Sequence, residues 1–256
     1  MVEEPEQREY KKMAKLTGYL VIAAGDTLSS GTTQQHPLGA LGVTADGRKF
    51  RYCRAGGAAL VTGDCYSSAG QDAQFEAMAI QANAAIGATS ISITIGTTTV
   101  AANDFDEGLL MVASGKGIGQ SSRILSHGTG TSGETVAFVI EDALKVALTT
   151  AGSSTLSVIK NPYDDVIIQA TTPVAQTAGI ASYAIPATEY GWLQTGGPAA
   201  CLFDASVNAV DTLGVAGSTT TEGAVRVAAA GSEMIGNAMQ VVTVSAEVGP
   251  VFLTLD

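Results

Sequence analysis

The sequence predicts an all-β protein built from antiparallel β-sandwich or β-barrel modules. Residues 88–96 alternate isoleucine with small or polar side chains, the two-residue period of a strand that buries one face. Between residues 87 and 165, short strand-like runs follow one another and are separated by glycine-rich turns, a spacing typical of sandwiches and barrels. The stretch contains no convincing set of catalytic groups, so we interpret it as a structural module.

The composition indicates a folded chain. Its 256 residues are 46% hydrophobic and only 14% charged, the opposite of the balance in disordered proteins. The mean hydropathy is positive, yet no apolar run reaches the about 18 residues of a transmembrane helix. We therefore expect apolar surface buried between subunits and no membrane partner. The net charge of −11 argues against nucleic acid as the main partner, because phosphate binding requires a basic surface.

The cysteines predict neither a disulfide framework nor a metal site. Cys53, Cys65 and Cys201 are odd in number, and their spacing matches no zinc pattern, so we expect buried free thiols and no cofactor. Residues 1–15 mix glutamates with basic residues and lack the apolar segment of a signal peptide. We predict that they form a flexible N-terminal extension.

Residues 16–66 form the predicted N-terminal β segment. A hairpin is indicated by Asp46-Gly47, and the strand that follows, residues 49–54, alternates basic with apolar side chains. This region holds a local basic patch in an acidic chain, which we take as a candidate interface: Arg48, Lys49, Arg51 and Arg54. Two interpretations stay open, a solvated strand face and a contact with an acidic neighbouring subunit.

Residues 67–86 form an Ala-rich linking segment. Phe75, Met78, Ala79 and Ala82 fall at helical spacing, and the segment contains no proline. The pattern favours a short helix over an extended linker, although alanine-rich sequence is compatible with both.

A central β module over residues 87–160 and a C-terminal β module over residues 161–256 complete the chain. Asn161-Pro162 marks the boundary between them, since proline disfavours helix before it. Within the last module Tyr190 and Trp192 alternate and therefore share one face. They are either core residues or anchors of an interface, where tyrosine and tryptophan are enriched.

Candidate chemistry is sparse. Gly115–Gln120 is predicted to be a turn between strands, because a phosphate-binding loop needs Ser or Thr after Gly-Lys and a following helix. His36 and His127 lie far apart, and a hydrolase that uses His127 as its base stays open only as an alternative. The acids at residues 104–107 lack the ligand series of an EF-hand and are predicted to form a surface loop, with a weak calcium site as the alternative. Arg123 and His127, four residues apart on one predicted strand, are expected to face the same side.

Several stretches between about Leu16 and the end of the chain form a familiar pattern: Gly25–Gly31, His36–Gly39, Asp46–Tyr52, Gly119-Gln120 with Arg123-Ile124, Asn161–Tyr163 and Tyr190–Ala200. Together they resemble structural proteins of tailed bacteriophages. Within that group the chain looks like a capsid decoration, or cement, protein. The resemblance implies a β-rich subunit, often a homotrimer, that binds the major capsid protein on the outside of an icosahedral shell. It implies no catalytic or cofactor-binding residues.

These observations together predict a structural virion protein that is made in the host cytoplasm and stabilises the capsid exterior through contacts with the shell and with its own copies. Another virion component, such as a tail part or a host-contacting spike, is the first alternative. A small β-fold hydrolase is the second.

Overall fold

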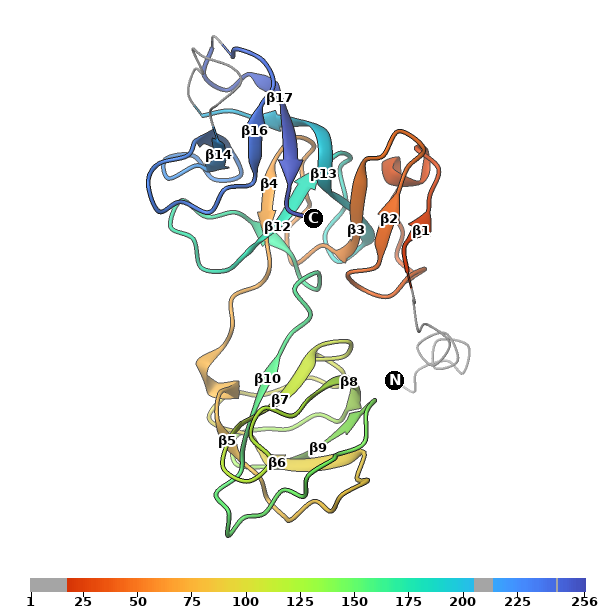
Figure 1. Cartoon of the computed structure of the whole chain (residues 1–256), viewed down its shortest axis with the longest axis vertical. Helices are drawn as coiled ribbons and strands as arrows, with labels where there is room; N and C mark the ends of the chain where they lie inside the picture. Colours follow the sequence, from red (N-terminus) through yellow and green to blue (C-terminus); the bar gives the residue numbers. More distant parts are fainter. Residues whose placement is uncertain (1–17, 205–213, 243) are drawn as a thin grey trace. The chain divides into compact units, whose positions relative to one another are not determined.

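The computed structural model describes residues 18–204, 214–242 and 244–256. These residues form 17 β-strands and two short 3-10 helices, which confirms the predicted all-β class. The predicted N-terminal extension, residues 1–15, lies outside the described residues. The chain divides into two compact units: unit 2 is residues 70–161, and unit 1 comprises the residues before and after it (Figure 1).

Unit 2 is a nearly closed antiparallel barrel (Figure 1). Its strands are β5 (Met78–Ala79), β6 (Ser90–Thr94), β7 (Leu109–Ser114), β8 (Ser121–His127), β9 (Thr135–Ile140) and β10 (Thr155–Ile159). They are ordered β5-β10-β7-β8-β9-β6, and every neighbouring pair is antiparallel. An isolated bridge between Ile80 and Ile93 joins the two ends of the sheet.

The alternating isoleucines that predicted a half-buried strand fill part of the barrel interior. Ile91, Ile93 and Ile95 are buried, while the residues between them are not. Phe138 of β9 and Leu156 of β10 join them in one hydrophobic cluster. Burying each large aliphatic side chain stabilises the fold by about 1.5–3 kcal/mol relative to leaving it exposed, so the periodic isoleucines hold these strands in register.

The predicted helix in the Ala-rich segment is wrong, and the extended alternative is what the structure contains. Only Ala73–Phe75 forms a single 3-10 turn (η2), capped by the Asp72 carboxylate, which accepts a hydrogen bond from the Gln74 amide. The chain then enters β5, and Ala77 has a φ of 49°, which an α-helix excludes. Pairing with β10 overrides the helical propensity, because the extended path buries Phe75, Met78 and Ile80 in the barrel.

Unit 1 is one branched sheet with 11 strands. The strands are β1 (Leu20–Val21), β2 (Leu41–Val43), β3 (Lys49–Arg54), β4 (Cys65–Ser67), β11 (Ile167–Ile168), β12 (Thr177–Ala181), β13 (Tyr190–Leu202), β14 (Gly214–Gly217), β15 (Val225–Val227), β16 (Gly236–Ala238) and β17 (Val248–Thr254), with the 3-10 helix η1 at Asp26–Leu28. The main path runs β1-β2-β3-β13-β17-β16-β14-β15. β12 pairs with β13 and β4, and β4 also pairs with β11.

The units do not follow the expected division into consecutive segments. The N-terminal β segment and the C-terminal β module share one sheet, because β3 pairs with β13 and β4 pairs with β11 and β12. Residues 70–86 of the expected linker belong to unit 2. The unit boundary does fall between Asn161 and Pro162.

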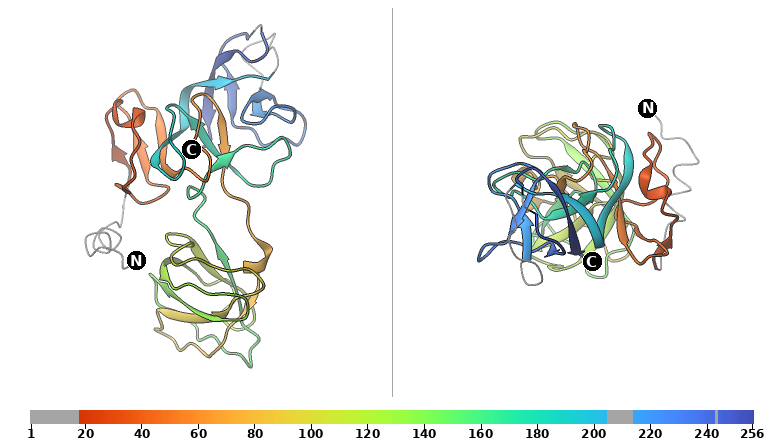
Figure 2. Two further views of the ribbon diagram at one scale, coloured as in Figure 1. Left: turned by 180° about the vertical axis from the view of Figure 1, so that it is seen from behind. Right: turned by 90° about the horizontal axis from the view of Figure 1, so that it is seen from above.

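β13 is the strand that joins the parts of unit 1. Its first half, Tyr190–Gln194, pairs with β3, and its second half, Gly196–Leu202, pairs with β17. Figure 2 shows from behind and from above that the dark blue strand β17 runs along β13. A register shift between Gln194 and Gly196 separates the two halves, so the strand bends where it changes partner.

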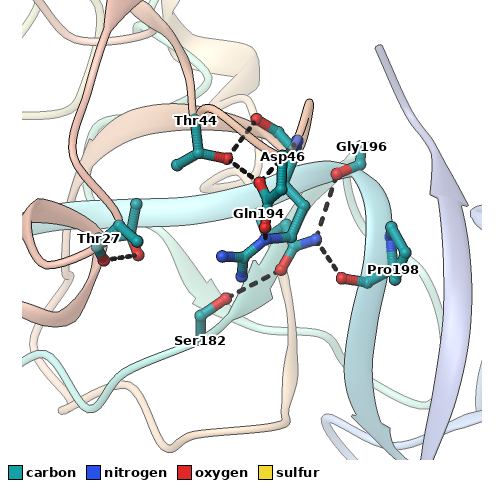
Figure 3. Close-up of polar contacts among 9 residues, drawn as sticks. Thr27, Thr44, Asp46, Ser182, Gln194, Gly196 and Pro198 are labelled. Atoms are coloured by element: carbon teal, nitrogen blue, oxygen red, sulfur yellow. Dashed lines mark hydrogen bonds and ion pairs between the residues drawn. The ribbon is translucent and has the colours of Figure 1, made fainter.

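The Gln194 side chain supports this bulge. Its amide Nε2 donates to the carbonyl oxygens of Gly196 at 3.2 Å and Pro198 at 2.7 Å, and its Oε1 accepts from Ser182 Oγ at 3.2 Å (Figure 3). Gln194 is 1% exposed, so these bonds satisfy a polar group that water does not reach. The Gln194 side chain therefore satisfies backbone carbonyl groups at the point where β13 bends.

Candidate functional site

A cleft with a volume of about 600 Å³ opens in unit 1 between the loop after η1 and the start of β13. We call it the aromatic cleft. One wall carries His36, Tyr52, Tyr190 and Trp192. The other wall is the loop, and its polar side chains are Asp26, Ser29, Ser30, Thr32, Thr33 and Gln35.

The aromatic wall follows from strand pairing. Tyr52 of β3 lies directly opposite Trp192 of β13, and their rings meet edge to face with centroids 5.0 Å apart. Tyr190, two residues before Trp192, stacks on Tyr52 with centroids 6.0 Å apart. The prediction that Tyr190 and Trp192 share a face is confirmed. Trp192 is only 4% exposed and belongs to the core, whereas Tyr190 is half-buried at the cleft.

The loop wall is held by hydrogen bonds. Gly31 and Tyr190 exchange both backbone hydrogen bonds, at 3.0 and 2.8 Å. The backbone N–H of Gln35 donates to the Tyr52 hydroxyl at 3.0 Å, and Ser30 Oγ donates to Glu189 Oε2 at 2.7 Å. Both walls are therefore positioned before any ligand arrives.

The cleft carries little charge. Among the residues that the structure describes, Asp26 is the one carboxylate on its walls, and no lysine or arginine lines it. Burial lowers the pKa of His36, and the nearby Asp26 carboxylate opposes this only in part, so the imidazole is neutral at pH 7. Such a site offers hydrogen bonds and ring faces, with no cationic group for an anion.

Three of the four residues of the predicted basic patch have acidic partners within unit 1. Arg48 Nε lies 2.8 Å from Asp46, and Arg51 Nη2 lies 2.6 Å from Asp256. Arg54 bonds two carboxylates, those of Asp164 at 2.6 Å and Asp165 at 2.8 Å. Lys49 forms no ion pair with another residue in the part of the chain that the structure describes. The arginine charges are thus balanced by acids of the same chain, and the proposed contact with an acidic neighbour stays a prediction.

A second surface feature, which sequence reasoning missed, is an apolar face on β13, β17 and the end of β16. The cross-strand pairs Pro198–Phe252, Ala200–Pro250 and Leu202–Val248 lie two residues apart and point to one side. Phe252 is 46% exposed and Val248 53%. Met239, whose amide donates to the Pro250 carbonyl, is 46% exposed beside them. We call this set the β13–β17 face: Pro198, Ala200, Leu202, Met239, Val248, Pro250 and Phe252.

The signal for the β13–β17 face was present in both strands. Pro198-Ala200-Leu202 and Val248-Pro250-Phe252 each place apolar residues at every second position. The residues between them in each strand, such as Cys201 and Val251, are apolar too, and their side chains are buried on the opposite face. With both faces apolar, the pattern predicts strands but does not tell which face is covered.

His127 is not available as a base. It is 5% exposed and packs on Phe138 with centroids 4.6 Å apart. Its Nε2 accepts from the Phe105 amide at 2.9 Å, and its Nδ1 lies 2.8 Å from the Gly128 carbonyl oxygen, to which it donates. The expectation that Arg123 and His127 face the same side is wrong, because a register shift between Ile124 and Ser126 turns His127 inward.

The remaining candidates are structural. The predicted surface loop at residues 104–107 is wrong for two of its acids, because Asp106 and Glu107 are each only 7% exposed. Gly115–Gln120 is a turn between β7 and β8, as predicted. Asp104 pairs with Lys160 at 2.8 Å and Glu107 with Arg123 at 3.0 Å. Among the described residues, no group of three or more His, Cys, Asp or Glu side chains could hold a metal ion.

The three cysteines are free and buried, as predicted. Burial raises the pKa of the Cys201 thiol to about 12 and raises the pKa of Cys53 and Cys65 as well. The thiols are therefore protonated and poorly nucleophilic at neutral pH.

No known protein family matches the sequence, and no curated protein or solved structure is similar to it. Within the described residues no helix is long and apolar enough to cross a membrane.

Proposed function

We propose that this chain is a structural virion protein that binds the outer surface of a bacteriophage capsid and stabilises it. The β13–β17 face carries the proposal. It is a run of exposed or half-buried apolar side chains on a regular sheet, and none of its seven members is charged. Contiguous apolar surface of this kind marks an interaction site, because leaving it in water is unfavourable.

Two further observations support an assembly role. The resemblance to phage decoration proteins covers strands that build unit 1, including β3 and the first half of β13. The polar candidates for chemistry in unit 2 are engaged in packing and ion pairs, as His127, Asp104 and Glu107 illustrate. In the proposed role the β13–β17 face contacts the shell or a sister subunit, and the many copies on one particle add by avidity.

Sedimentation of particles tests this function. In a lysate of the virus that encodes the chain, we expect the protein to travel with the heads. Phe252→Asp places a charge at the centre of the β13–β17 face and should lower the bound fraction roughly tenfold or more, since central aromatic residues dominate interfaces. Val174→Asp is the matched control, because Val174 is 61% exposed in unit 1 but lies outside that face.

A wild-type protein that stays at the top of the gradient would sink the proposal. Equal binding by Phe252→Asp and wild type would assign the contact to another surface.

The second candidate function is a host-contacting tail or spike component, which the aromatic cleft favours. Labelled particles imaged by electron microscopy separate the two, because a decoration protein covers the head and a spike lies on the tail.

A further inference from the structure

We propose that the aromatic cleft is a binding site for a neutral carbohydrate. This activity goes beyond the proposed role in the capsid and holds for a head or a tail protein. It rests on the volume, charge and side chains of the cleft, each of which narrows the class of ligand.

The charge of the cleft disfavours anions. Nucleotides, phosphates and acidic sugars need a cationic partner, and the described residues of the walls include neither lysine nor arginine. The arginines of the neighbouring strand β3 are paired with Asp256, Asp164 and Asp165, and Arg48, just before the strand, is paired with Asp46. The single carboxylate, Asp26, accepts hydrogen bonds and suits a ligand rich in hydroxyl groups.

The polar wall matches such a ligand. Ser29, Ser30, Thr32, Thr33 and Gln35 line the cleft within seven consecutive residues, and all five side chains are polar. Four of them carry hydroxyl groups. The Ser29 and Ser30 hydroxyl groups donate to the Asp26 carbonyl oxygen and to Glu189, so towards a ligand they offer acceptor lone pairs. A sugar presents hydroxyl groups that both donate and accept, so it satisfies this wall better than an apolar molecule would.

The aromatic wall supplies the other half of the recognition. The half-buried Tyr190 is backed by the Tyr52 ring, which is nearly parallel to it, with an angle of 9° between the ring planes. The negative face of an aromatic ring attracts the partly positive C–H groups on the apolar face of a sugar ring. The volume of about 600 Å³ is in the range of small-molecule sites.

Fluorescence tests the proposal directly, because Trp192 is the only tryptophan in the chain and lines the cleft. The full-length protein is titrated with neutral sugars: glucose, galactose, mannose, N-acetylglucosamine, maltose, lactose and cellobiose. We expect at least one of them to change the Trp192 emission saturably, with a Kd on the order of 1 mM, an ordinary affinity for a small polar ligand in an open site. Saturation-transfer NMR on the same samples reports contact independently of fluorescence.

Two glycine variants localise the binding. A Cβ at Gly31, on the cleft wall, meets no atom within 4 Å, so a side chain can start there without a backbone clash, and Gly31→Leu is designed to occupy part of the cleft. Gly57→Leu is the matched control, because a Cβ there also meets nothing and Gly57 lies outside the cleft. Gly31→Leu should weaken binding at least tenfold with an unchanged melting temperature, and Gly57→Leu should bind like wild type.

Three results would overturn the proposal. The first is no saturable response to any sugar of the panel at 50-fold the expected Kd. The second is equal weakening by both glycine variants. The third is a response to choline without a response to sugars, which would assign the aromatic rings and Asp26 to an organic cation. Failure of sugar binding leaves the sedimentation result unchanged, so the two proposals fail separately.

Discussion

At the scale of single residues, polar side chains shape unit 1: Gln194 is buried, and the Arg51–Asp256 pair is partly exposed. Gln194 holds the bulge at which β13 passes from β3 to β17, and the Arg51–Asp256 pair joins residues 205 positions apart. Both contacts involve the paired strands β3 and β13, because Arg51 lies on β3 opposite Leu193, the residue before Gln194 on β13. These contacts position the aromatic cleft and the β13–β17 face on one continuous sheet.

Gln194→Leu should destabilise the protein by about 1–3 kcal/mol, because it removes the partner of two carbonyl groups and leaves a buried site with unpaired acceptors. Urea unfolding followed by far-UV circular dichroism measures this loss. The control is Gln176→Leu at an exposed position, where a change within about 0.5 kcal/mol is expected. Equal stability of both variants would mean that the bulge forms without the amide.

The Arg51–Asp256 pair predicts a dependence of stability on pH. The hydrogen bond from Arg51 lowers the pKa of Asp256 in the folded state. The pair therefore contributes stability above the unfolded pKa of about 3.9, and this contribution is lost as the pH falls through the lower folded pKa. Arg51→Met should cost about 1 kcal/mol or less at pH 7, since the pair is partly exposed. Unfolding curves at pH 7, 5 and 3 check it: the difference from wild type should shrink towards pH 3.

At the scale of elements, the Ala-rich segment shows how tertiary pairing overrides local propensity. Its alanines favour helix, but β5 completes the barrel by pairing with β10, and the bridge from Ile80 to Ile93 closes it. The buried residues follow the extended chain: Phe75, Met78, Ile80 and Ala84 are inside, while Ala79 and Ala82 of the expected helical stripe are exposed.

Ala77→Gly distinguishes the two conformations by the sign of its effect. Ala77 has a positive φ, which glycine adopts without strain, so in the observed structure the substitution should be neutral or stabilise the protein by up to about 1 kcal/mol. In a helix the same change would destabilise by about 1 kcal/mol. Thermal and urea unfolding measure the sign, and a clear loss of stability would contradict the extended path.

At the scale of the whole molecule, unit 2 is an insertion into unit 1. The chain leaves unit 1 after β4 and returns before β11, and these two strands pair, with Ser67 opposite Ile167. The ends of the insertion are therefore held together by a sheet that does not need the barrel. Unit 2 in turn has its own core cluster. Insertion between close chain ends is well tolerated for this reason.

Each unit should fold alone. Residues 70–161 expressed alone are expected to give a β-type circular dichroism spectrum and one cooperative thermal transition. The complementary variant, in which a short Gly-Ser turn replaces residues 70–161, should keep the Trp192 emission of the full chain. A non-cooperative melt of the isolated barrel would show that its stability depends on unit 1.

Much of the architecture was accessible from sequence because alternation along a strand is local. The isoleucines of residues 88–96 predicted a half-buried strand, the glycines at residues 115–119 predicted a turn, and Pro162 marked the unit boundary. For the candidate site, the shared face of Tyr190 and Trp192 followed from the same two-residue period.

Only the tertiary structure decided which strands meet. Alternation states which residues of one strand share a face, but the partner that covers the face is set by contacts between residues far apart in sequence. Tyr52 meets Trp192 across such a distance, and so do Arg51 and Asp256. β-Bulges also limit the prediction of side-chain orientation from sequence. One extra residue in a strand reverses the side to which all later side chains of that strand point, as at His127. The sequence by itself therefore determined the β class, the turns and one boundary. The sheet order, the ion-pair partners, the aromatic cleft and the β13–β17 face depend on long-range pairing, which a local pattern does not encode.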